Sequence, residues 1–124
     1  MPQGYAVPTS HTVIMIDHTI DKIEATVRAA ETIQEDLRRE LLGLLNTLKS
    51  EITELSKTNA DQARSITGFA ELSAHEATRE NQNPQLLEHS LAGMQAAVDG
   101  FEKSHPRLVQ AVNSISQTLS NLGI

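Results

Sequence analysis

The chain has 124 residues, 39% of them apolar and only 2% aromatic, so a core must be built from aliphatic side chains. Its formal charge of −6 argues against nucleic acid or an anionic membrane as the main partner, because both favour a dense cationic surface. The absence of cysteine excludes disulfides, a thiolate nucleophile and cysteine-ligated zinc.

Two observations bear on the location of the protein. The longest apolar run, Val13-Ile14-Met15-Ile16, is far shorter than the ~20 residues of a bilayer-spanning helix. The first residues also lack the pattern of a secretory signal, so we expect a cytoplasmic protein.

Residues 1–14, which carry two prolines and a glycine in their first eight positions, predict a flexible leader. Residues 15–124 are expected to form a single helical domain.

A long helical region is predicted over residues 16–80. Apolar residues recur every three or four positions from Ile16 to Leu55, which places them on one helical stripe. Thr32 and Glu35 fit a capping box that would allow a break near residues 31 and 32, but no proline or glycine enforces one. The expected apolar seam of this region comprises Leu37, Leu41, Leu44, Leu48, Ile52 and Leu55.

The pattern weakens after Leu55. A thin stripe of small residues extends from Ala63 to Ala77, which favours close packing against another helix. Asn59 is positioned to cap a separate segment, so residues 32–80 form either one rod or two segments.

A helical hairpin is predicted next, with helices over about 84–103 and 106–122. Asn83 and Pro84 fit the N-cap and first position of a helix, and Pro106 starts the second helix after a short turn. Helices joined this closely pack antiparallel. The expected seam of the hairpin comprises Leu87, Leu91, Met94, Val98, Phe101, Leu108, Val112, Ile115, Leu119 and Leu122.

Two motifs of the hairpin, Phe101-Glu102-x-Ser104-His105-Pro106-x-Leu108 and the final Leu119-Ser120-Asn121-Leu122-Gly123-Ile124, resemble a family of small bacterial helical proteins known only as a domain of unknown function. The stretches Gly68–Glu71 and Asn83–Leu87 look like the longer members of that family. The resemblance covers roughly residues 60–124. It implies a helical fold and transfers no catalytic residue.

Few residues carry recognisable chemistry. Glu102 and His105 have the Glu-x-x-His spacing of di-iron bundles, but such a site needs a second motif that the chain lacks. His75 and His89 lie beside acidic residues, and two histidines with two carboxylates are a sensible zinc site, although surface histidines are the commoner case. No serine elbow or glycine-rich phosphate loop is present. We therefore expect no catalytic residue, cofactor or metal site.

The pattern as a whole predicts an all-α protein in which a long amphipathic helix joins a C-terminal antiparallel hairpin in a coiled-coil-like bundle. A continuous helix over 16–80 would be ~95 Å long and the hairpin only ~30 Å. Either the rod folds back or a second chain covers it; the unbroken leucine seam favours a homodimer, with a tetramer as the next possibility. The predicted function is a non-catalytic scaffold or adaptor that contacts itself or another bacterial protein through the leucine face or the stripe from Ala63 to Ala77. A metal- or ligand-binding bundle is the alternative.

Overall fold

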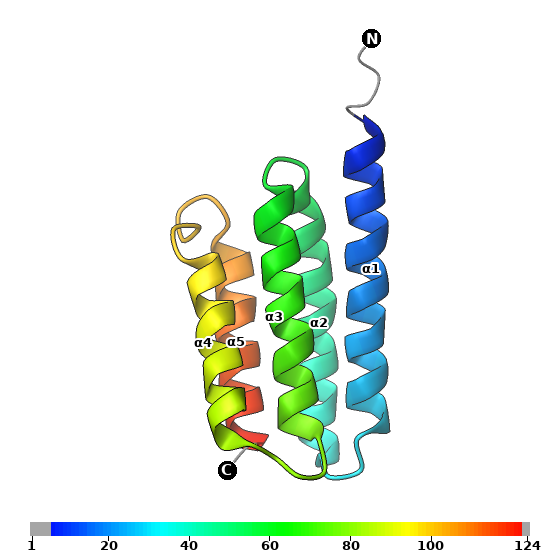
Figure 1. The fold of residues 1–124 in the computed structure, drawn as a ribbon, viewed down its shortest axis with the longest axis vertical. Coiled ribbons are helices and arrows are strands. Elements are labelled where there is room, and N and C mark those ends of the chain that lie inside the picture. Colours follow the sequence, from blue (N-terminus) through cyan, green and yellow to red (C-terminus); the bar gives the residue numbers. More distant parts are fainter. Residues whose placement is uncertain (1–5, 123–124) are drawn as a thin grey trace.

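The computed structural model describes residues 6–122, with side chains from residue 13 onward. The predicted all-α fold is confirmed, since this range contains helices and no strand, and none of its helices is long and apolar enough to cross a membrane. The five helices run up and down in sequence order (Figure 1) and are α1 (Ala6–Ala29), α2 (Glu35–Ser56), α3 (Ala60–Thr78), α4 (Pro84–Val98) and α5 (Pro106–Leu122).

The central pair of helices is α2 and α3. Helix α1 packs along one side of this pair, and the hairpin of α4 and α5 packs along the other (Figure 1). Helix α3 contacts all four other helices, whereas α1, within the described residues, contacts only α2 and α3. Helix α4 likewise contacts only α3 and α5, so α3 lies at the centre of the bundle and α1 and α4 lie at its margins.

The chain enters its first helix earlier than the sequence suggests. Residues 6–14 of the predicted leader belong to α1, while residues 1–5 lie outside the described range. The expectation fails because Pro8 is the third residue of the helix. In a first turn the missing N–H of proline has no intrahelical partner to lose.

The long helical region is divided into three helices. The first break covers residues 30–34 and the second residues 57–59. The predicted capping box is not formed, because the N-cap of α2 is Gln34, which makes no side-chain capping bond. Asn59 is the N-cap of α3, and its side chain also makes no capping bond to the helix. Neither break is followed by a side-chain N-cap, so we attribute both breaks to packing.

The leucine face of α2 is covered within one chain. Helices α1, α3 and α5 pack on α2, so the face has three neighbours of its own chain. Of the two alternatives that the sequence leaves open, the rod folds back on itself, so the leucine face of α2 gives no argument for a second chain. On α2, Leu41, Leu48, Ile52 and Leu55 are buried, and Leu37 and Leu44 are half-buried against the core.

The stripe of small residues lies in the core. Ala63, Ala70, Ala74 and Ala77 of α3 are at most 2% exposed. Small side chains let the central helix approach its neighbours closely, as the sequence indicates. The stripe is therefore not an external working surface, contrary to the prediction.

The hairpin closes through a longer turn than predicted. Helix α4 ends at Val98 instead of residue 103, because Gly100 has φ +95°, a conformation that interrupts a helix. Phe101 lies in this turn, where it stays packed against the core and also contacts His105 edge-to-face, with ring centroids 5.8 Å apart. Elsewhere in the expected seam, Leu87, Met94, Val98, Leu108, Val112, Ile115 and Leu119 are buried, and Leu91, Phe101 and Leu122 are half-buried. Gly123 and Ile124 lie outside the described residues.

Candidate functional site

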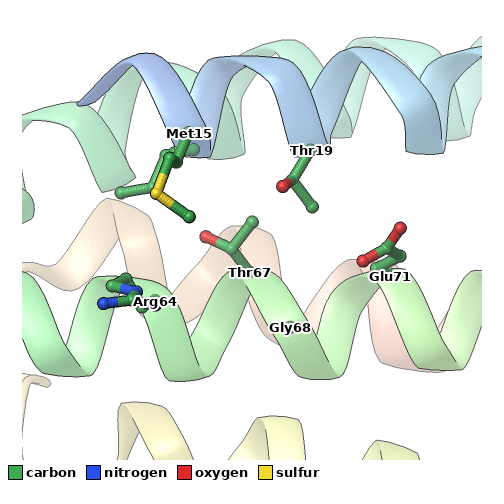
Figure 2. A pocket seen from close by; sticks show the side chains of 7 residues that line it. Met15, Thr19, Arg64, Thr67, Gly68 and Glu71 are labelled. Carbon is green, nitrogen blue, oxygen red and sulfur yellow. The ribbon is translucent and has the colours of Figure 1, made fainter. Parts of the chain in front are cut away.

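A groove between α1 and α3 is the best candidate for a working surface. It consists of two adjoining hollows, one of about 180 Å³ and one of about 320 Å³. Gly68 and Glu71 of α3 line both, so the hollows form one feature that we call the α1–α3 groove. Figure 2 shows Met15 and Thr19 of α1 facing α3 across the first hollow.

Gly68 leaves the middle of this groove open. A Cβ atom at this position would have no heavy atom within 4 Å, so no close packing contact requires glycine here. Glycine in the interior of a helix nevertheless costs about 1 kcal/mol relative to alanine. The residue is therefore a local weakness in α3 whose structural effect is to widen the groove.

The groove combines apolar side chains with charge. Met15 is 40% exposed and Leu72 is 44% exposed, so the groove contains two of the large apolar side chains that the described part of the chain exposes. The Lys22 ammonium lies 2.9 Å from the Glu71 carboxylate and joins the two helices beside the groove. Arg64 lines the first hollow and forms no ion pair with any described residue.

Another hollow, separate from the two that form the α1–α3 groove, lies between α1 and α2 and is polar. It has a volume of about 490 Å³ and is lined in part by Asp17 and Lys49. The Lys49 ammonium lies 3.1 Å from the Asp21 carboxylate. This hydrogen bond, aided by the negative charges of Asp21, Asp17 and Glu24, raises the pKa of Lys49 above its usual value. The acids of α1 are thus partly neutralised from α2, and the hollow offers no apolar anchor.

The predicted metal candidates are dispersed. His75 lies exposed at the end of the α1–α3 groove, and His89 is exposed on α4. Glu102 accepts a hydrogen bond from the Gly100 N–H at 3.0 Å, while His105 packs against the Phe101 ring. Across the part of the chain that the structure describes, no three histidine, aspartate or glutamate side chains converge as metal ligands would.

One residue has a different role from the one the sequence indicates. Arg38 and its neighbour Arg39 suggest a solvated, salt-bridged face, yet the Arg38 side chain is only 17% exposed. Its guanidinium donates hydrogen bonds to four backbone carbonyls in and after the last turn of α1, those of Val27, Arg28, Ala30 and Ile33. No local pattern identifies such a cap, because its acceptors precede the arginine by five to eleven positions.

Comparison with known sequences gives a family. A model of the family described as "Domain of unknown function (DUF4404)" matches residues 41–124, which is more than half of the chain. The match begins inside α2 and includes α3, α4 and α5. No curated protein and no solved structure matches the chain at a significant level.

Proposed function

Because the chain belongs to the family described as "Domain of unknown function (DUF4404)", we propose its role from its own surface: a non-catalytic helical adaptor whose α1–α3 groove binds a segment of another protein. The observation that carries the proposal is Gly68. It opens the groove at a cost in helix stability that no packing contact offsets.

The dimensions of the groove favour a peptide segment. From Arg64 to His75 the lining residues of α3 extend over three helical turns, about 16 Å. Two moderate hollows in series suit successive side chains of an extended or helical segment better than one compact metabolite, which is usually held in a single deeper cavity. Met15 and Leu72 would supply apolar contact, and the Arg64 guanidinium would attract an acidic residue.

The proposed adaptor acts as a monomer. The leucine seam, from which the sequence predicts a homodimer, is covered by α1, α3 and α5 of the same chain. The exposed apolar residues of the groove offer a smaller surface, which is typical of a transient partner. This supports binding to another protein in preference to permanent self-assembly.

A site-specific photocrosslinker tests the proposal in cells. We expect a discrete adduct when the crosslinker replaces Leu72 in the groove and none when it replaces Gln117, which is exposed on α5. Gly68→Ala should weaken the Leu72 adduct, because its methyl group projects into the open space at the centre of the groove. Gly43→Ala is the matched control, since Gly43 is also helical with open space at its Cβ position. An adduct that survives Gly68→Ala unchanged would contradict the proposal.

A further inference from the structure

Helix α1 is held on the bundle mainly by the side chains of one of its faces. Its apolar stripe of Ile16, Ile20, Ile23 and Val27 is buried against only two helices, α2 and α3. One ion pair flanks each side of this stripe, Lys22 with Glu71 of α3 and Asp21 with Lys49 of α2. Besides these contacts, the Arg38 guanidinium of α2 binds the last carbonyls of α1, and the chain connects α1 to α2.

The family match separates α1 from the rest of the fold. It starts at residue 41 and contains most of α2 with all of α3, α4 and α5. Each contact between helices in this part of the chain is made without α1. Helix α1 therefore lies wholly outside the matched residues, and it docks on the face that α2 and α3 present.

The connection between α1 and α2 is compatible with two conformations. Residues 30–34 contain no proline and no glycine, so nothing in their covalent structure prevents a helix. In the folded chain the Arg38 guanidinium binds the carbonyls of Val27, Arg28, Ala30 and Ile33, at 3.0, 2.9 and 3.0 Å for the last three.

A continuous helix would satisfy the same four carbonyls in another way. Each would accept the N–H group four positions ahead, from residues 31, 32, 34 and 37. The two conformations thus compete for one set of acceptors. The bent form depends on one arginine side chain and on the burial of Ile33, so loss of the arginine shifts the balance toward the straight form.

We propose that α1 is an exchangeable helix whose alternative acceptor is the α2–α3 face of a second copy of this chain. When the Arg38 cap is released, residues 30–34 straighten, α1 and α2 become one helix, and two chains exchange their α1 helices. Exchange of an identical element recreates every contact of α1 except those of the hinge. The α1–α3 groove of such a dimer would take Met15 from one chain and Gly68 from the other. This inference does not depend on the adaptor role.

Arg38→Gln tests the exchange, because glutamine is shorter and offers at most two donors. Light scattering on a size-exclusion column, over a hundredfold range of concentration, should show a dimer fraction that increases with concentration. Arg39→Gln is the matched control: the Arg39 side chain is 73% exposed, and its ion pair within the described residues is with Glu35, at 3.9 Å. It should remain monomeric like the unaltered chain. A folded Arg38→Gln variant that stays monomeric at the highest concentration would overturn the proposal.

A second variant covers the case in which Arg38→Gln does not fold. Glu31→Ala with Thr32→Ala keeps the arginine and raises the helix propensity of two exposed hinge residues. We expect this double variant to form more dimer than the unaltered chain. If it remains as monomeric as the unaltered chain, the straightening hinge is refuted.

A crosslink identifies which chain supplies α1. The protein has no cysteine, so Lys22→Cys and Glu71→Cys introduce the only two thiols, in place of side chains that meet across the groove. In the exchanged dimer a short bis-maleimide should join two chains, whereas in the monomer it should join the two thiols of one chain. Dimers that show only crosslinks within a chain would mean ordinary association and would overturn the exchange.

Discussion

The turns between helices are determined differently in the two parts of this bundle. In the C-terminal part the turns are encoded locally: Asn83 caps α4, Pro84 and Pro106 begin α4 and α5, and Gly100 supplies the positive φ between them. In the N-terminal part the breaks at 30–34 and 57–59 contain neither proline nor glycine. The first break is held by the Arg38 side chain, and the N-cap residue of the helix after each break makes no side-chain capping bond.

This difference matters because the proposed working surface lies in the N-terminal part. A locally encoded turn keeps its conformation when its surroundings change. A turn that depends on tertiary contacts can be altered by one side chain or one partner. The α1–α3 groove is thus built from the two helices whose relative placement is least determined by local sequence.

The largest effect is expected at Arg38. Arg38→Gln should lower the free energy of unfolding by about 2–3 kcal/mol, because several hydrogen bonds from a charged donor to partly buried carbonyls are lost. Urea unfolding of the monomer at low protein concentration measures this. Arg39→Gln should change stability by less than about 0.5 kcal/mol, as for other surface substitutions. Equal effects of the two substitutions would show that the cap contributes nothing to the bend.

Substitution by alanine should have opposite effects on stability among the three glycines that lie inside the described helices. A Cβ at Gly93 would overlap the Phe69 ring of α3, so Gly93→Ala should destabilise by about 1–3 kcal/mol despite its better helix propensity. Gly43→Ala and Gly68→Ala meet no neighbour and should each stabilise by about 0.5–1 kcal/mol. Thermal unfolding of the three variants measures the contrast. Destabilisation by Gly68→Ala would mean that the groove is filled.

The two N-cap asparagines separate the regions directly. The Asn83 side chain accepts hydrogen bonds from Gln85 and Leu86 N–H, at 3.1 and 3.2 Å, so Asn83→Ala should cost about 1 kcal/mol. The Asn59 side chain makes no such bond, and Asn59→Ala should cost only a few tenths. Chemical denaturation of both variants, compared in one buffer, gives the difference. A larger loss at Asn59 would contradict the account of the second break.

The smallest effect concerns alkaline pH. The hydrogen bond to Asp21 raises the pKa of Lys49 in the folded state, so the pair stabilises the protein fully below the unfolded-state value of 10.5. This contribution is lost as pH rises through the folded-state pKa. The decrease should be small because both side chains are solvated. Unfolding midpoints at rising alkaline pH should fall less in Asp21→Asn than in the unaltered chain.

The sequence is informative where structure is local. Helical periodicity identifies the apolar positions of α2, α4 and α5, and Asn83, Pro84 and Pro106 indicate element boundaries. It is less informative where distant residues decide the outcome. The Arg38 cap reaches back as far as Val27, and the exposure of Leu72 depends on how α1 sits beside α3.

The candidate site shows the same limit. In the sequence, Gly68 only lowers the helix propensity of its segment. The arrangement of α1 and α3 places it at the open centre of a groove. The histidines, which carry the clearest chemistry in the sequence, do not converge with acidic residues into a site within the described part of the chain.

Small-angle X-ray scattering of the unaltered chain, collected behind a size-exclusion column over a hundredfold range of concentration, tests the central claim that the N-terminal half folds back within one chain. The account predicts a compact monomer at every concentration. Its longest dimension should stay well below the roughly 75 Å of a continuous helix over residues 6–56. An elongated particle of that length, or a dimer that persists at the lowest concentration, would contradict the account.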